Sequence, residues 1–159
     1  MSNIKLTNKE EFHSTTEELY KHMYSILEKY YHEPIEEILE TSAGDGRLID
    51  YLNSKGHKVK AYDIVNRTGR ADIEIGDYLK TKIEYKKGRV TFQNPPFAKG
   101  IKFIYKALEE SDYCVSILAL SSFLNLDYEK YEVDTIDIFR NYDFGSCKTS
   151  ICIVGIRKK

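Results

Sequence analysis

A run of residues typical of a β-strand, 90–93, ends in Asn94, Pro95, Pro96 and Phe97. Two consecutive prolines fix φ twice and have no backbone N–H, so they predict a stiff turn whose carbonyl groups can face a ligand. Because a residue before proline favours an extended conformation, the Asn94 side-chain oxygen and the Pro95 carbonyl could both accept hydrogen bonds from one planar NH2 group. This bonding would direct the nitrogen lone pair towards an electrophile. Phe97 could stack on the ring that carries the amine.

A second turn, Glu40–Gly46, contains two glycines and also follows a strand-like run. Gly44 and Gly46 tolerate positive φ and leave room for a ligand to approach the backbone. Glu40 could accept hydrogen bonds from an ammonium or hydroxyl group. By itself, a Gly-x-Gly turn is equally typical of an ordinary connection between a strand and a helix.

Carboxylates also follow the next two predicted strands. Asp63 ends the segment 58–63, and Asp77 comes just after 72–75. In open parallel sheets, ligands bind beyond the carboxyl ends of the strands, where Asp63 could hold both hydroxyls of a ribose. Asp77 could accept from an exocyclic adenine amine. Each could be a simple cap or turn residue, but with Glu40 they place acids at three successive strand ends.

Hydrophobic periodicity predicts the elements that position these residues. Helical spacing is found at 14–31, 47–55 and 100–110, with a helical turn at 77–81. Strand-like runs occupy 35–40, 58–63, 72–75, 89–93, 113–120, 135–141 and 150–157. The run 113–120 is apolar almost throughout, as expected for a strand buried on both faces.

Helical or turn segments separate the first five strands, whereas a short connection through Gly145 joins the last two. This order predicts an α/β fold with a mostly parallel, doubly wound sheet and an antiparallel hairpin at one edge. We expect one domain over residues 1–159, with an N-terminal helical segment, 1–33, and a core, 34–159.

Two segments carry a specific resemblance. Leu39–Gly46 resembles the cofactor loop of amino-methyltransferases dependent on S-adenosylmethionine, usually Leu-Glu-Pro-Ser-Ala-Gly-x-Gly. Asn94–Phe97 is similar to their Asn/Asp-Pro-Pro-Tyr/Phe motif. Among these proteins the chain looks most like the N6-adenine DNA methyltransferases, including phage-type examples. The resemblance implies a Rossmann-like class I methyltransferase fold with seven strands and a C-terminal antiparallel hairpin.

The resemblance also implies S-adenosylmethionine as the cofactor and assigns roles to residues. The cofactor contacts that it implies are Glu40, Ser42, Ala43, Gly44, Gly46, Asp63, Asp77 and Asn94, and the catalytic residues are Asn94, Pro95, Pro96 and Phe97. Phe12–Thr15 faintly resembles the Phe/Tyr-x-Thr-Pro segment that packs on the methionine end of the cofactor. Ser121–Leu124 and Gly145–Arg157 resemble the strands that follow the catalytic motif.

One departure from that family is large, because no segment is long enough to be a target-recognition domain. The loop 124–134 is short and acidic. Reading a base sequence directly needs an element in a groove of the nucleic acid. An enzyme of this size would therefore have relaxed specificity, prefer single strands, form a homodimer or use a partner specificity subunit.

The formal net charge of the 159-residue chain is −1, although nucleic-acid enzymes usually present basic surfaces. Basic residues gather on both sides of Asn94 and at the C-terminus, which predicts a rim that faces phosphates. The residues are Lys80, Lys82, Lys86, Lys87, Arg89, Lys99, Lys102, Lys106, Arg157, Lys158 and Lys159.

Other features of the composition bear on the cellular environment, on metal binding and on membrane association. Cys114, Cys147 and Cys152 form no CxxC pair, which favours a reduced, cytoplasmic environment (the host cytoplasm for a viral protein). The four histidines are scattered, so no metal site is predicted. No apolar run is long enough to span a membrane, and we expect no membrane partner.

The leading hypothesis is methyl transfer to N6 of adenine in DNA. An adenine in RNA or a glutamine amide in a protein presents the same planar NH2 group, so both alternatives stay open. A further alternative is a methyltransferase-like subunit without catalysis, or an anti-defence protein. The intact motifs at 40–46 and 94–97 argue against that alternative, because such a protein has no chemical need for them.

Overall fold

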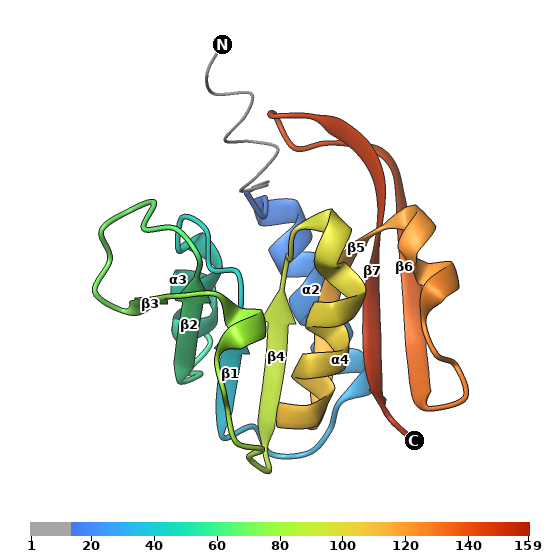
Figure 1. Cartoon of the computed structure of the whole chain (residues 1–159), viewed down its shortest axis with the longest axis horizontal. Coiled ribbons are helices and arrows are strands. Elements are labelled where there is room, and N and C mark those ends of the chain that lie inside the picture. Colours follow the sequence, from blue (N-terminus) through green and yellow to red (C-terminus); the bar gives the residue numbers. More distant parts are fainter. Residues whose placement is uncertain (1–13) are drawn as a thin grey trace.

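The computed structural model describes residues 14–159, and its strands form one sheet in the order β3-β2-β1-β4-β5-β7-β6 (Figure 1). The strands that pair in parallel are β1 (Glu37–Glu40), β2 (Val59–Asp63), β3 (Ile73–Ile75), β4 (Arg89–Gln93) and β5 (Tyr113–Ala119). The chain builds outward from β1 through β2 to β3 and then returns to β4 on the other side. The strand order therefore reverses between β1 and β4.

The last two strands, β6 (Tyr131–Asp143) and β7 (Lys148–Lys158), form an antiparallel hairpin, and β7 inserts between β5 and β6. The predicted fold class, a mostly parallel seven-stranded sheet with an antiparallel C-terminal hairpin, is confirmed. Both strands are longer than predicted. Polar residues at the start of β6 hid its true beginning, but Glu132 pairs with Arg157 of β7. Arg140 lies where the register of this pairing shifts, between Phe139 and Tyr142.

Helices cover both faces of the sheet (Figure 1). On one face lie α2 (Glu17–Tyr30) and α3 (Arg47–Ser54), and on the other lies α4 (Gly100–Glu110). Thr16 caps α2 by accepting from the Leu19 N–H across 3.3 Å. Buried side chains of α2, including Met23, pack with Phe92 of β4, so the core beneath the strand ends is apolar.

Short 3-10 helices occupy several connections: η1 (Tyr78–Lys80), η2 (Phe97–Lys99) and η3 (Leu120–Asn125). The helical turn predicted at 77–81 is confirmed by η1. The strand-like assignment of Ser121–Leu124 is wrong, because these residues form η3. Phe12 and His13 lie outside the described residues. Within residues 14–159, no helix is long and apolar enough to cross a membrane.

Candidate active site

A pocket of about 790 Å3, counted with its open mouth, lies at the carboxyl ends of β1, β2 and β4, where the strand order reverses. The predicted site residues that line it are Ser42, Ala43, Gly44, Asp63, Asp77, Asn94, Pro95 and Pro96. Three other predicted residues, Glu40, Gly46 and Phe97, lie outside the lining. The sheet thus brings the glycine loop, two strand-end acids and the proline turn to one cavity, at the usual ligand position of this architecture.

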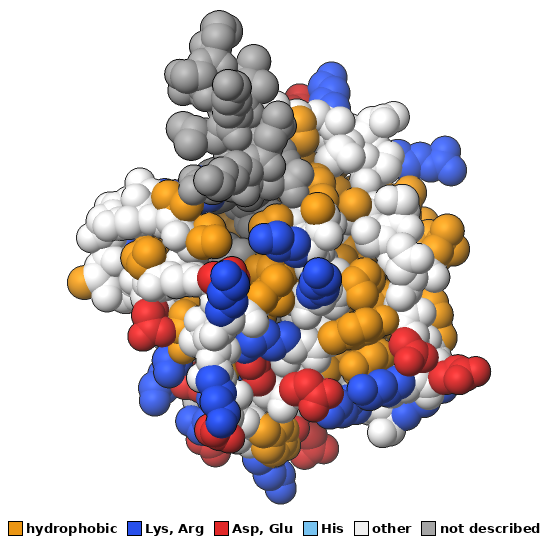
Figure 2. All heavy atoms as spheres, viewed as in Figure 1, with side chains coloured by type: hydrophobic (Ala, Val, Ile, Leu, Met, Phe, Trp, Pro, Cys, Tyr) orange, Lys and Arg blue, Asp and Glu red, His pale blue; other side chains and the backbone are white. Residues whose placement is uncertain are grey.

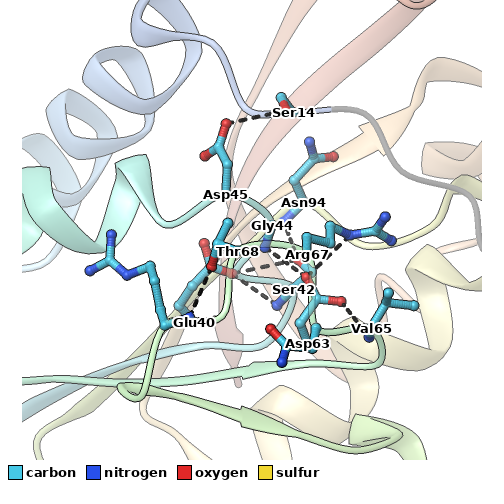
Figure 3. A network of polar contacts seen from close by, with 12 residues as sticks. Ser14, Glu40, Ser42, Gly44, Asp45, Asp63, Val65, Arg67, Thr68 and Asn94 are labelled. Carbon is cyan, nitrogen blue, oxygen red and sulfur yellow. Dashed lines mark hydrogen bonds and ion pairs between the residues drawn. The ribbon is translucent and has the colours of Figure 1, made fainter.

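Asp63, at the end of β2, holds the glycine loop in place (Figure 3). Its Oδ2 accepts a hydrogen bond from the Gly44 N–H at 2.7 Å, and its Oδ1 accepts from the Val65 N–H at 3.2 Å. Arg67 Nε lies 3.7 Å from Oδ2. Because a carboxylate offers about four acceptor positions, Asp63 can keep these contacts and still accept from ligand hydroxyls.

Glu40 lies beneath the pocket wall and is only 1% exposed. Its Oε1 accepts from the Ser42 N–H at 2.9 Å. Burial, reinforced by the nearby charges of Asp63 and Asp45, raises the pKa of Glu40 to about 8, although the Ser42 hydrogen bonds oppose this effect. A cation in the adjoining pocket would favour the ionised form of this carboxyl group.

Two further acids line the pocket. Asp77 caps η1 by accepting from the Leu79 N–H at 3.0 Å, and it also lines the pocket. A capping role and a position in the pocket are therefore compatible for this residue. Asp45 was not predicted. Its Oδ2 accepts from Ser14 Oγ at 3.3 Å and from Arg47 Nε at 2.8 Å. The available signal was its place between the two glycines of the loop.

Gly46 serves the shape of the loop. Its φ is +85°, and a Cβ atom there would lie 2.4 Å from Arg70 Nη1. The Arg70 guanidinium donates to the Gly46 carbonyl at 3.2 Å and is held by Asp50 and Asp72. The positive φ of Gly46 and the packing of Arg70 behind the loop therefore both disfavour a side chain at this position.

The proline turn is anchored from two directions. The Asn94 N–H donates to Ser42 Oγ at 2.9 Å, and Asn94 Nδ2 donates to Thr15 Oγ1 at 3.3 Å. Thr15 also lines the pocket, with Pro95 and Pro96. These contacts fix the direction of the Asn94 amide at the pocket wall.

Phe97 packs against the C-terminal hairpin. Its ring centroid lies 6.1 Å from that of Phe144, and the two planes are tilted by 57°. Phe144 in turn makes an edge contact with Tyr142 at 5.0 Å. Sequence reasoning missed this arrangement because it joins the end of β4 to a turn far along the chain.

The predicted basic rim divides between the two ends of the sheet. Lys99 lines the pocket, and exposed Lys80 and Lys102 are close to lining residues in sequence. Figure 2 shows basic side chains gathered over η1 and the upper part of α4. Arg89, at the opposite end, is buried and pairs with Glu37 at 3.0 Å.

The remaining basic residues also lie away from the pocket or serve other contacts. Lys106 pairs with Glu110 and lies over the Tyr78 ring. Arg157 pairs with Asp134 near the start of β5, which is the end remote from the pocket. Among residues 14–159, no group of histidine, cysteine and acidic side chains could hold a metal ion.

No protein family profile and no curated protein sequence matches this chain. Solved structures match its fold. A candidate RNA methyltransferase from Pyrococcus horikoshii superposes with a TM-score of 0.70 at 15% identity, covering 93% of this chain and 85% of that one. The 23S rRNA methyltransferase ErmE gives 0.65 at 17% identity, covering 87% and 68%. A dimethyladenosine transferase from Plasmodium falciparum gives 0.62 at 17% identity, covering 87% and 61%.

At these identities the similarity establishes the fold. The chain has the Rossmann-like α/β fold of these methyltransferases.

Proposed function

We propose that this protein transfers a methyl group from S-adenosylmethionine to the N6 amine of adenine in a nucleic acid, with DNA as the leading substrate. The observation that carries this proposal is the shared pocket. An acid-lined half beside the glycine loop meets a half formed by Asn94, Pro95 and Pro96. The first half suits a cationic nucleoside, and the second suits a planar amine.

The pocket chemistry fits S-adenosylmethionine better than a phosphate-bearing dinucleotide. Three acids, Asp45, Asp63 and Asp77, outnumber the two basic residues of the lining, Arg67 and Lys99. Carboxylates repel phosphates but attract ammonium and sulfonium groups. Asp63 would hold the ribose hydroxyls, and the loop around Gly44, with Glu40 beneath it, would lie beside the methionine end. Apolar side chains in the lining could enclose the adenine ring: Leu48, Ile64, Tyr78 and Phe103.

The reaction would depend on orientation of the substrate amine. When bound, S-adenosylmethionine would supply a methyl group from its positively charged sulfur, and the S–CH3 bond would break to leave S-adenosylhomocysteine. Asn94 Oδ1 and the Pro95 carbonyl each accept one N–H of the amine, which directs the nitrogen lone pair towards the cofactor half of the pocket. The contact of Asn94 Nδ2 with Thr15 holds this orientation. Neither acceptor titrates, so the proton that the amine loses passes to water at the pocket mouth.

RNA is the second candidate substrate. ErmE is a 23S rRNA methyltransferase, and the Plasmodium protein is a dimethyladenosine transferase. The basic surface beside the pocket, Lys80, Lys99 and Lys102, would suit the backbone of either nucleic acid. A protein substrate with a target glutamine has no phosphate backbone for these lysines to bind. The lysines therefore favour a nucleic-acid substrate over a protein substrate.

The test is methylation of both polymers in one reaction. Purified protein is incubated with S-adenosylmethionine and a mixture of unmethylated DNA and RNA, and N6-methyladenine is quantified in each by mass spectrometry. We expect signal in DNA that Asn94→Ala lowers by about 100-fold or more, while cofactor binding is retained. Asn53→Ala, an exposed asparagine on α3, is the matched control.

N6-methyladenine found only in RNA would make RNA the substrate in place of DNA. Cofactor binding without methylation of either polymer would favour a glutamine substrate or a non-catalytic role. Near-normal activity of Asn94→Ala would contradict the mechanism.

A further inference from the structure

Side chains continue the pairing of β1 with β4 after the backbone pairing ends. The last paired residues are Glu40 and Phe92. At the next position Thr41 Oγ1 donates to Gln93 Oε1 at 2.5 Å, and one position further the Asn94 N–H donates to Ser42 Oγ at 2.9 Å. Both pairs keep the strand register, with a separation of 52 residues. Two side-chain bridges thus cross the point where the strands diverge to form the pocket.

We propose that Ser42 is a positioning residue, whose hydroxyl holds Asn94 in register with the cofactor loop. This inference rests on the proposed function. Proline has no N–H, so Asn94 provides the single backbone donor of the segment Asn94–Pro96. That donor is given to Ser42 Oγ. The turn is therefore fixed, through its one available backbone donor, to the loop that would hold the methyl donor.

Ser42 is itself held in place. Its own N–H donates to Glu40 Oε1 at 2.9 Å, and its hydroxyl lies 3.5 Å from the same oxygen. Because Ser42 both lines the pocket and accepts from the Asn94 N–H, a shift of this loop would move Asn94. Misplacement of a reacting group by about 1 Å can lower a rate by about 100-fold, so one hydroxyl at this position can control the reaction.

The lower bridge has a different character. Thr41 and Gln93 are 2% and 0% exposed, whereas Ser42 is half-buried at the pocket wall. Gln93 Nε2 is buried and has no hydrogen-bond partner among the described residues. Thr41 also lines the pocket, but the upper bridge is the one that holds the backbone of Asn94.

The experiment compares Ser42→Ala and Ser42→Thr with Ser25→Ala, which removes an exposed hydroxyl on α2. We expect Ser42→Ala to lower the single-turnover rate of methyl transfer by about 10- to 100-fold at saturating cofactor. Ser42→Thr keeps the hydroxyl and should recover most of that rate. Amide hydrogen exchange of the Asn94 N–H should be at least about tenfold faster in Ser42→Ala, because its acceptor is lost.

A double-mutant cycle separates positioning from general damage. In the background of Asn94→Ala, adding Ser42→Ala should lower the rate by less than about threefold, because the side chain that Ser42 positions is already absent. Full additivity, or an unchanged rate in Ser42→Ala, would overturn the proposal. If the unaltered protein transfers no methyl group, the proposed function fails. Hydrogen exchange then tests the hydrogen bond from Asn94 to Ser42 without an activity assay. Unchanged protection of the Asn94 N–H in Ser42→Ala would overturn the proposal that Ser42 holds Asn94.

Discussion

Asp63 Oδ2 accepts a hydrogen bond from the Gly44 N–H at 2.7 Å, so a carboxylate at the end of β2 holds the loop that leaves β1. Asp63 is 6% exposed and also lines the pocket. One side chain therefore holds the glycine loop and, in the proposed site, would present acceptors to the ligand.

Asp63→Asn should weaken S-adenosylmethionine binding by about 10- to 100-fold. The amide loses charge-assisted hydrogen bonds, each of which contributes about 1.5–3 kcal/mol. Isothermal titration calorimetry measures the effect. Glu74→Gln, an exposed acid on β3, is the control and should bind normally. Equal affinity of Asp63→Asn and the unaltered protein would remove Asp63 from the cofactor site.

The free energy of unfolding should depend on pH in a way that reflects the raised pKa of Glu40. Burial raises its pKa to about 8 from an ordinary value of 4.5. Between these pH values the folded protein binds more protons than the unfolded chain does. The stabilisation from Glu40 is therefore complete below the unfolded pKa and is lost as the pH rises through the folded pKa. The corresponding slope is at most about 1.4 kcal/mol per pH unit.

Urea unfolding at several pH values between 5 and 8, roughly the window in which one shifted carboxyl titrates, checks this prediction. Glu40→Gln should show a flatter decline in unfolding free energy with rising pH than the unaltered protein. Glu74→Gln should leave the decline unchanged, because that side chain is exposed. Parallel curves for Glu40→Gln and the unaltered protein would contradict the assigned protonation.

The sequence predicted the order and type of the main elements because their hydrophobic patterns are local. Asp63 and Asn94 follow strong strand patterns, and parallel strands bring such ends to one edge of a sheet. That rule was sufficient to place both residues at one pocket. It needs no knowledge of side-chain contacts.

Other features depend on tertiary contacts that local patterns do not encode. Clustering in sequence grouped Arg89 with Lys99. Arg89 is the first residue of β4 and Lys99 follows the end of that strand, so the two residues lie at opposite ends of the sheet. The crowding of Gly46 by Arg70 and the packing of Phe97 on Phe144 join segments separated by several elements. A strand pattern gives the position of its ends, but it does not give the partners of side chains beyond them.

Lys99 should contact the substrate backbone. Lys99→Ala is expected to weaken nucleic-acid binding and to reduce the slope of log K against log salt by about 0.7–0.9, the effect of one lost phosphate contact. Fluorescence anisotropy across a salt series measures this slope. Lys87→Ala removes an exposed lysine at the opposite end of the sheet and should leave the slope unchanged. Equal slopes for both variants would mean that the polymer does not pass beside the pocket.

Gly46→Ala should destabilise the protein more than Gly56→Ala does. Both glycines have similar φ angles, +85° and +88°, so the alanine strain of about 1–2 kcal/mol is common to both. Only the Gly46 variant places a Cβ against the Arg70 guanidinium, whereas no atom lies within 4 Å at Gly56. Chemical denaturation measures the difference. Equal losses would show that Arg70 moves aside without cost.

Phe97 and Phe144 provide a test of whether the aromatic ring of the motif serves packing, substrate binding or both. Because their rings are in contact, a double-mutant cycle with alanine should give a coupling of about 0.5–1.5 kcal/mol in unfolding free energy. A coupling near zero would contradict the packing role. The two single variants then separate the functions. If Phe97 also stacks on the target base, Phe97→Ala lowers methyl transfer far more than Phe144→Ala at equal stability. If Phe97→Ala and Phe144→Ala lower the rate equally, Phe97 only packs the proline turn against the C-terminal hairpin.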